Sequence, residues 1–386
     1  MRRAAVLVLC VILVSTAFAG CIDWSEKKDK KAENQLPTVE EGGTTQLPEE
    51  GITVQFINST YEIASGGTSG WFTSGQDADI MLSGIDFNNT GGPLLFNHQG
   101  NVATDDTRLL LADRNNNRIL IWNSLPTGNS PPNIVLGQEN FYTNNPGTGL
   151  NQMNWPVSVV TDGQHVVVAD TYNDRVLIWN NFPTLQNGTS ADLELKEGIG
   201  WPWAVWTNGT KLVVASTTPC RTVLIWNTFP TSNVPADIFI SLPDFGTPRA
   251  IASDGNHLVI GDHNAFVNGT QQKGNFFWKT FPTQNNQPYD FFVAAISTMG
   301  EPYPPPNIMG DILWGTMTSD GKLIGVANQL YIWNSFPEDE NDTPDLSVGA
   351  DFPGASGYDF GESGDGSGVA VAGNKLYVSM SNGVEP

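Results

Sequence analysis

Histidine and cysteine, the usual zinc ligands, are scarce in this sequence and widely spaced. The histidines are His98, His165, His257 and His263, and Cys220 is the one cysteine beyond the first 21 residues. A cysteine nucleophile needs a histidine beside it, and a zinc site needs clustered histidines or cysteines. The spacing shows neither arrangement. Cys220 is therefore expected to be a small buried residue, and no disulfide can form within the body of the chain.

Acidic segments are the other candidates for chemistry, because calcium binds carboxylate and carbonyl oxygens. DRNNNR at 113–118 is similar to the start of an EF-hand loop, but it lacks the central glycine and the terminal glutamate. DENDTPD at 339–345 and GESGDGSG at 361–368 are typical of solvated turns. No Ser-His-Asp spacing, phosphate-binding loop or zinc-helix motif is present. We predict no cofactor, with calcium as the ion left open.

A repeated phrase dominates the sequence and indicates architecture rather than chemistry. It occurs as RILIWNSLPT at 118–127, RVLIWNNFPT at 175–184, TVLIWNTFPT at 222–231, NFFWKTFPT at 275–283 and LYIWNSFPE at 330–338. Its tryptophans, which we call the IWN tryptophans, are Trp122, Trp179, Trp226, Trp278 and Trp333. They are 57, 47, 52 and 55 residues apart, a period typical of propeller blades with modest loop insertions.

Each copy has the same neighbours and predicts four β-strands. Upstream, two apolar runs flank the tetrads TDGQ, TNGT, SDGN and SDGK, which place Asp or Asn before Gly as tight hairpins require. Downstream, a short apolar run such as PNIVLG or ADIFIS supplies a fourth strand. Consecutive apolar residues in VLIW point to both faces of the sheet, so each sheet must be covered on both sides. Radial stacking achieves this, and the IWN tryptophans then fill the space between blades.

The fold class predicted is therefore all-β, a six-bladed β-propeller with four-stranded antiparallel blades. Five blades follow from the five phrases, and the sixth is assembled from both ends of the domain. Residues 368–383 would supply its first two strands, residues 52–58 the third and residues 77–84 the fourth. Such a shared blade closes the ring and holds the termini in place.

The segments ADRNNNRILIWN at 112–123 and ADTYNDRVLIWN at 169–180 resemble NHL-type repeats. The hallmark is an Asp, a turn Asn and an Arg, here Asp113, Asn116 and Arg118 in one copy and Asp170, Asn173 and Arg175 in the next. The resemblance covers residues 94–384 and weakens in the later copies. It implies a six-bladed propeller of a kind that mostly binds partners, with a minority of enzymes. We expect the Asp to accept turn amides and to pair with the Arg, which is a structural role.

The candidate site follows from the register of the blades. Alignment on the turn glycines brings one position before each innermost strand to the same mouth of the central channel, and ligands commonly bind where such loops converge. The side chains there differ between blades, as a site on a symmetric scaffold requires. The residues chosen are His98, Trp155, Trp201 and Asp365, with Trp203 and Arg249 two places later in their blades.

The amino terminus predicts export and a lipid anchor. Arg2 and Arg3 precede a 4–19 apolar run that has the length of a signal-peptide core, and FAGC then resembles a lipoprotein processing box in which Cys21 accepts the lipid. An ordinary secretory signal and an uncleaved anchor are the alternatives. The domains expected are a signal peptide at 1–20, a lipid-anchored flexible tether at 21–50 and the propeller at 51–386. The protein would then be extracytoplasmic, on the outer face of the cell membrane.

Charge narrows the range of partners. The chain carries 40 acidic and 18 basic residues, and six of the basic residues lie within the first 31 positions. An anionic body repels phosphate backbones, so nucleic acid is excluded as a partner.

We predict a non-enzymatic, surface-tethered propeller that binds a protein or glycan through the channel-mouth loops. The alternatives are a calcium- or zinc-dependent hydrolase or lyase at that mouth, and a structural subunit of a cell-envelope complex.

Overall fold

The computed structural model describes residues 92–219, 221–295, 312–327, 330–348 and 368–379. The chain divides into two units, residues 1–69 and 70–386, and every described residue belongs to the second. The signal peptide, Cys21, Cys220 and the strands expected at 52–58 and 77–84 lie outside the described residues. No helix in the described part is long and apolar enough to cross a membrane.

Each of the five phrases lies in one four-stranded antiparallel sheet whose strands pair in chain order. Blade 1 contains β1 (Val102–Thr104), β2 (Leu109–Asp113), β3 (Arg118–Trp122) and β4 (Ile134–Leu136). Blade 2 contains β5 (Pro156–Thr161), β6 (Val166–Asp170), β7 (Arg175–Trp179) and β8 (Leu193–Leu195). Blade 3 contains β9 (Pro202–Thr207), β10 (Leu212–Ser216), β11 (Thr222–Trp226) and β12 (Ile238–Ile240). Blade 4 contains β13 (Pro248–Ser253), β14 (Leu258–Val267), β15 (Thr270–Trp278) and β16 (Phe291–Ala294), and blade 5 contains β17 (Trp314–Met317), β18 (Leu323–Val326), β19 (Leu330–Trp333) and β20 (Leu346–Val348).

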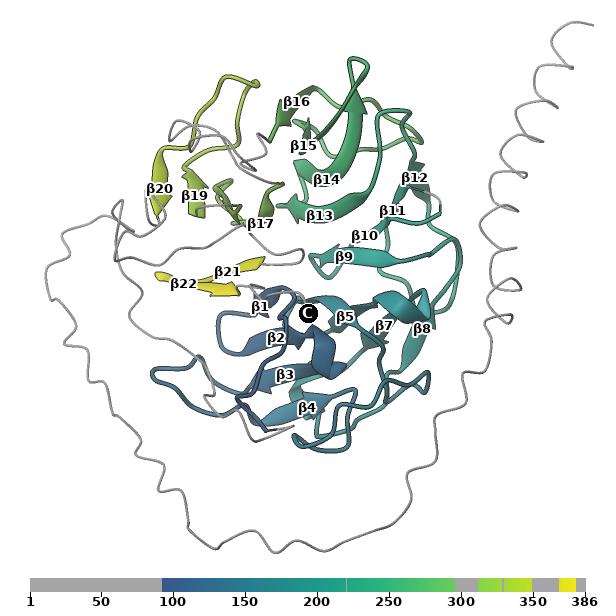
Figure 1. Cartoon of the computed structure of the whole chain (residues 1–386), viewed down its shortest axis with the longest axis vertical. Helices are drawn as coiled ribbons and strands as arrows, with labels where there is room; N and C mark the ends of the chain where they lie inside the picture. The colour runs from purple at the N-terminus through teal and green to yellow at the C-terminus, as the bar shows by residue number, and fades with distance from the viewer. Residues whose placement is uncertain (1–91, 220, 296–311, 328–329, 349–367, 380–386) are drawn as a thin grey trace, which may run out of the picture. The chain divides into compact units, whose positions relative to one another are not determined.

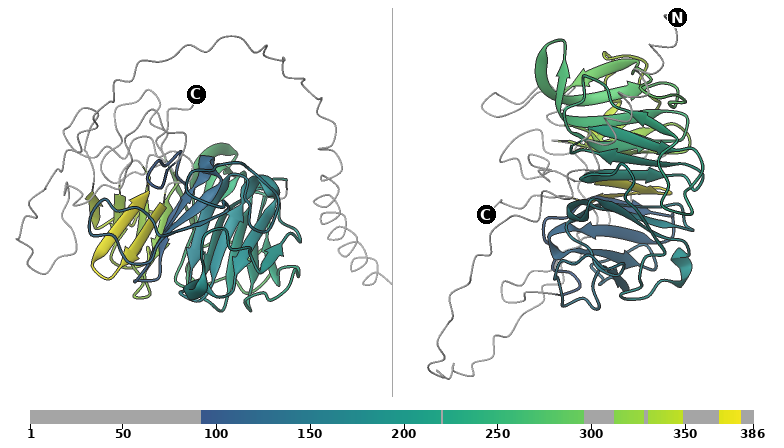
Figure 2. Two further views of the ribbon diagram at one scale, coloured as in Figure 1. Left: turned by 90° about the horizontal axis from the view of Figure 1, so that it is seen from below. Right: turned by 90° about the vertical axis from the view of Figure 1, so that its right-hand side faces the viewer.

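The prediction of a β-propeller built from four-stranded antiparallel blades is confirmed. Figure 1 shows the sheets around a common centre, with the first strand of each blade innermost and the fourth outermost. Figure 2 shows the blades packed face against face. Short 3-10 helices occur at η2 (Arg114–Asn116), η3 (Thr171–Asn173) and η4 (Phe182–Thr184). The first two are turns between the second and third strands of their blades, so they lie on the face where the inner strands begin, which we call face A.

Tight turns join the first two strands of each blade on the opposite face, face B. Gly163, Gly209 and Gly255 have φ values of 88°, 82° and 89°, the left-handed region that glycine enters without strain. The hydroxyl that ends the inner strand also stabilises the turn, as in Thr161, which donates to the carbonyl of His165 and accepts from the amide of Gly163. The Asp-Gly and Asn-Gly pairs in the sequence therefore mark these hairpins.

The IWN tryptophans occupy the contacts between neighbouring blades. Trp179 packs in a cluster with Leu110 and Ile121 of blade 1, and Trp278 packs with Ile225 of blade 3. Each indole Nε1 donates to a carbonyl in its own blade, at 2.7 Å for Trp122 and 2.9 Å for Trp179. Because the apolar ring is buried and its polar atom has an acceptor, these tryptophans are core residues.

A second contact, which we call the turn latch, joins successive blades on face B. The residue just before each second strand places its side chain on a phenylalanine of the next blade's phrase. The pairs are Arg108 with Phe182 at 3.5 Å, His165 with Phe229 at 4.1 Å, Lys211 with Phe281 at 4.1 Å and His257 with Phe336 at 4.3 Å. A cation or an imidazole over an aromatic face is attractive, so the latch reinforces the apolar packing.

The number of complete blades differs from the sequence prediction. Five four-stranded sheets are described where six were expected, and the remaining sheet has two strands, β21 (Gly368–Ala372) and β22 (Lys375–Ser379). Strand β21 contacts both β1 and β17, so this sheet lies between blade 1 and blade 5 (Figure 1). The described residues therefore form a ring of sheets in which the last segment of the chain meets the first blade.

Candidate functional site

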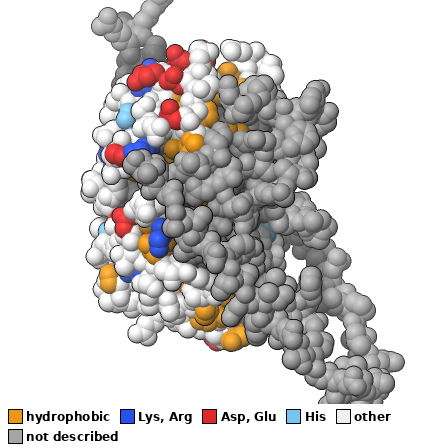
Figure 3. All heavy atoms as spheres, turned by 90° about the vertical axis from the view of Figure 1, so that its left-hand side faces the viewer, with side chains coloured by type: hydrophobic (Ala, Val, Ile, Leu, Met, Phe, Trp, Pro, Cys, Tyr) orange, Lys and Arg blue, Asp and Glu red, His pale blue; other side chains and the backbone are white. Residues whose placement is uncertain are grey.

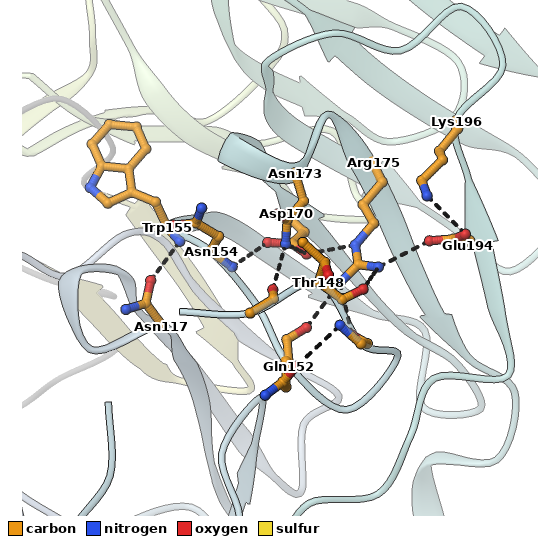
Figure 4. Close-up of polar contacts among 12 residues, drawn as sticks. Asn117, Thr148, Gln152, Asn154, Trp155, Asp170, Asn173, Arg175, Glu194 and Lys196 are labelled. Carbon is orange, nitrogen blue, oxygen red and sulfur yellow. Dashed lines mark hydrogen bonds and ion pairs between the residues drawn. The ribbon is translucent and has the colours of Figure 1, made fainter. Parts of the chain in front are cut away.

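The Asp, Asn and Arg of the repeated motif form a buried polar cluster in blades 1 and 2. In blade 2, Asp170 accepts hydrogen bonds from the amide of Asn154 at 2.7 Å, from Asn173 at 2.8 Å and from Arg175 Nε at 2.7 Å (Figure 4). Arg175 donates onward to the carbonyls of Thr148, Gly149 and Gln152 and to Glu194. Burial raises the pKa of Asp170, against the lowering effect of these bonds. With its partners all provided by the chain, the cluster fixes the loop that precedes β5.

Blade 1 repeats this arrangement and blade 4 modifies it. Asp113 accepts from the amide of Asn97, from Asn116 and from Arg118 Nε at 2.8, 2.9 and 2.7 Å. Burial raises the pKa of Asp113, and Arg118 opposes that rise. In blade 4, Asp262 accepts from the amides of Gly246, Thr247 and Asn264 instead. In all three blades a buried carboxylate holds the approach to the inner strand.

The positions predicted for the site share one backbone conformation. His98, Trp155 and Trp201 have φ values of 53°, 59° and 47°, in the left-handed region that non-glycine residues rarely adopt. Each tryptophan amide donates to the turn of the preceding blade, Trp155 to Asn117 Oδ1 at 2.7 Å and Trp201 to Asp174 Oδ1 at 3.0 Å. These bonds between blades hold the strained backbone in place, and Figure 4 shows the bond between Trp155 and Asn117.

Aromatic rings connect these positions on face A. Trp155 stacks on Tyr172 with ring centroids 4.5 Å apart, and Tyr172 stacks on Trp201 at 5.6 Å. Trp155 Nε1 donates to Asn115 Oδ1 at 2.8 Å, and Tyr172 is 42% exposed. We call Trp155, Tyr172 and Trp201 the surface ring row. It reaches solvent at Tyr172 and is held by the same turns that carry the polar clusters.

The row continues into the channel. Trp155 meets Trp203 edge to face at 5.4 Å, and Trp203 lies 6.4 Å from Trp314. Two guanidinium groups accompany the rings, Arg114 at 4.6 Å from the Trp155 ring and Arg249 at 4.3 Å from the Trp203 ring. Desolvated cations gain most from such contacts, and Arg114 is buried.

The structure thus brings together four of the predicted site residues, Trp155, Trp201, Trp203 and Arg249. His98 has the equivalent backbone position in blade 1, and Asp365 lies outside the described residues. Sequence reasoning missed Arg114, Asn115 and Tyr172, which lie in turns that were assigned a structural role only.

Trp314 was missed because alignment on the turn glycines does not select its position. Trp314 pairs with Val326 at the place where Ala204 pairs with Ala215 in blade 3, so Leu313 and not Trp314 stands level with Trp203. The blade 5 turn is also one residue longer than the blade 2 turn, since Leu323 pairs with Met317 whereas Val166 pairs with Thr161.

The larger cavity lies at the other mouth of the channel, which sequence reasoning did not choose. Its volume is about 860 Å³, and the ends of the inner strands line it on face B. The walls are mostly uncharged, with Thr104, Thr161, Thr207, Trp206 and Met317 among them. A smaller cavity of about 40 Å³ adjoins it deeper in the channel, beside Trp203, Arg249 and Trp314.

The remaining surface offers little concentrated chemistry. On the side of the molecule drawn in Figure 3, acidic side chains gather at the upper end of the described surface, and basic and apolar side chains are scattered below them. The exposed large hydrophobic residues of the described part are Tyr142, Leu150, Tyr172, Val234 and Phe266. Within the described ranges, no group of three or more His, Cys, Asp or Glu side chains lies together as a metal site would need.

Comparison with known proteins gives only distant structural similarity. No protein-family model matches the chain. No curated protein matches it either. One solved structure with partial similarity is Kuenenia stuttgartiensis hydrazine synthase, which is 13% identical over 68% of this chain and 72% of that chain, with a TM-score of 0.35. Another is the WD40 repeats of RRP9, which are 12% identical over 64% of this chain and 65% of that chain, with a TM-score of 0.41.

Proposed function

We propose that the protein is a non-enzymatic β-propeller that binds a protein or glycan partner on face A, through loops at the channel mouth. The observation that carries this proposal is the surface ring row, Trp155, Tyr172 and Trp201. Rigid aromatic side chains supply large contact area at a low cost in conformational entropy, and tryptophan and tyrosine are enriched at binding hot spots. The hydrogen bonds that Asn117 and Asp174 accept from the amides of Trp155 and Trp201 hold the row in place before a partner binds.

The finer architecture belongs to the same proposal. The clusters of Asp113 and Asp170 with their Asn and Arg partners support assignment to the NHL type of repeat. We further propose that the β21–β22 sheet is half of a sixth blade, completed by residues 52–58 and 77–84. The position of β21 between β1 and β17 supports this, because the five other described sheets of the ring have four strands each.

The proposed location rests on the amino-terminal sequence. Cleavage before Cys21 and lipidation of its thiol would tether the propeller through the polar segment 21–50 to the outer face of the cell membrane. Metabolic labelling with a radioactive fatty acid tests this: the wild-type chain should incorporate label, and Cys21→Ser should not. Equal labelling of both chains would contradict the anchor.

Binding of the partner is tested on face A with matched variants. The purified chain is applied to a glycan array and to immobilised proteins of the cell surface, with Tyr172→Ala and Trp201→Ala compared with Tyr142→Ala. Tyr142 is also an exposed aromatic residue, 72% accessible, but it lies outside the ring row. We expect the first two changes to weaken binding about tenfold or more, in the range of hot-spot residues. A ligand bound equally well by all three variants would contradict face A as the site.

A further inference from the structure

Two buried indole N–H groups near the centre of the channel lack an acceptor. Nε1 of Trp203 and Nε1 of Trp314 are inaccessible and have no hydrogen-bond partner among the described residues, although the two residues are only 3% and 5% exposed. The IWN tryptophans behave differently, since Trp122, Trp179 and Trp226 all donate to a carbonyl. Buried donors in native proteins are nearly always paired. We therefore expect a bound acceptor to complete the hydrogen bonds of these two groups.

The two rings line the cavity of about 40 Å³ together with Arg249, whose guanidinium carbon lies 4.3 Å from the Trp203 ring. An indole N–H and a guanidinium can only donate hydrogen bonds. In the described part of the chain, no acidic residue lines this cavity. Among the described residues, a pocket lined by a guanidinium and by no acidic side chain is a local exception in a protein with a formal net charge of −22.

The other polar groups of the cavity are already used. Asn101 makes two bonds with the backbone of Val159, one from its Nδ2 and one to its Oδ1, and Ser158 Oγ accepts from the amide of Val205. One acidic group coupled to Arg249 is Asp262, which lies outside the cavity lining and accepts hydrogen bonds from three backbone amides. Among the described lining residues, the cavity therefore presents two indole donors without an acceptor, next to the Arg249 guanidinium.

Its size and position limit what can enter. A volume of about 40 Å³ accommodates a single small polar group, since one water occupies about 30 Å³ in the liquid. The cavity shares Asn101, Val205 and Gly315 with the 860 Å³ cavity on face B, so the two spaces lie next to each other. The larger space is within the usual size range of small-molecule pockets.

We propose that the channel binds a small carboxylic acid from face B. Its carboxylate lies in the inner cavity, where it accepts hydrogen bonds from Trp203 Nε1 and Trp314 Nε1 and pairs with Arg249. The rest of the ligand occupies the larger cavity among the threonine residues and Trp206. This site is separate from the partner surface on face A, and a simple organic acid and a sugar acid share the chemistry that it recognises.

Nuclear magnetic resonance of the full chain labelled with ¹⁵N-tryptophan tests the proposal directly, because the indole N–H signals report the missing acceptor. The titrants are sodium acetate, sodium glucuronate, neutral glucose and sodium chloride at matched ionic strength. Trp203→Phe and Trp314→Phe assign the two signals while keeping an aromatic ring at each position. We expect both signals to move downfield and to saturate with a carboxylate, and to stay in place with glucose or chloride. Acetate binding as tightly as glucuronate identifies a simple acid, and tighter glucuronate binding identifies a sugar acid.

Further outcomes decide against the site. If the indole signals respond to neither acid, the cavity holds water alone. If glucose shifts them as much as the acids do, the site does not recognise charge. Either result overturns the proposal. Arg249→Gln should weaken acetate or glucuronate binding about tenfold, as loss of a charge-assisted bond predicts. Tyr172→Ala should leave the indole titration unchanged, so failure of the carboxylate site and failure of the face A surface are distinguishable.

Discussion

At the scale of single residues, the repeated motif pairs a buried carboxylate with a buried guanidinium and supplies hydrogen bonds to both. Asp170 and Arg175 are almost fully buried, and each makes several hydrogen bonds within the chain. An ion pair of this kind adds little net stability compared with apolar residues, but removal of one partner leaves the other charge buried and unpaired. A single substitution in the motif is therefore expected to be strongly destabilising. In the structure, the motif orders the loops on face A.

The first prediction follows from that asymmetry. Arg175→Gln should lower the free energy of unfolding by about 3–5 kcal/mol, because Asp170 stays buried without its cation. Arg221→Gln is the matched control, since Arg221 is exposed and Ser216 replaces the motif aspartate in its blade. Its effect should be below about 0.5 kcal/mol. Urea unfolding of both variants checks the difference, and equal losses would contradict the special role of the buried pair.

A pH dependence is expected at the face B turns. Burial tends to raise the pKa of Asp162, but bonds from the His165 amide, the His165 ring and the Gln164 amide bring it below the ordinary value. The carboxylate therefore stabilises the fold above the unfolded-state pKa of about 3.9, and this contribution is lost as the pH falls through the lower folded value. Asp162→Asn mimics the protonated group. Its urea midpoint should lie below that of the wild type at pH 6, and the gap should narrow as the pH falls below about 4. A gap that stays constant as the pH falls would refute this account.

At the scale of elements, neighbouring blades are joined by side chains of defined type. The turn latch uses Arg108, His165, Lys211 and His257 at one position, each over a phenylalanine of the next blade. Outer strands are also covered by the following blade, as where Asn187 Oδ1 accepts from the amide of Val135 in β4 at 3.0 Å. Pairing of this kind removes free edge amides, which otherwise promote association between sheets.

A double-mutant cycle measures the turn latch. His165→Ala and Phe229→Ala should show a coupling energy of about 0.5–1.5 kcal/mol, the range for paired aromatic rings, because their centroids are 4.1 Å apart. The control cycle combines His165→Ala with Phe281→Ala, since Phe281 is covered by Lys211 instead. Free energies of unfolding in that cycle should add. Coupling of equal size in both cycles would mean that the ring responds as a whole and that the latch is not a local contact.

At the scale of the whole molecule, the sequence predicts the repeating parts well and the irregular parts poorly. The blades follow from the IWN phrase and its turn glycines, because local packing fixes both. The candidate site is harder to predict from the sequence, because it depends on residues that differ between blades. Trp314 lies one place after the position that is level with Trp203, and Tyr172 lies in a turn that was assigned a structural role. The large face B cavity depends on how the strand ends converge. Such features arise from tertiary geometry, and the repeat pattern of the sequence does not predict them.

Closure of the ring is the property that depends on the whole chain, and glycine substitutions test it. A Cβ on Gly368 would lie 2.5 Å from Asn101 Cβ and 2.8 Å from its Cα, at the contact between β21 and blade 1. Gly368→Ala should therefore cost about 1–3 kcal/mol of unfolding free energy, as overpacking typically does. Gly128→Ala is the control, because nothing lies within 4 Å of its Cβ position. If both variants unfold at the same urea concentration as the wild type, the β21–β22 sheet does not pack against blade 1 in solution, and the ring is open where the ends of the chain should meet.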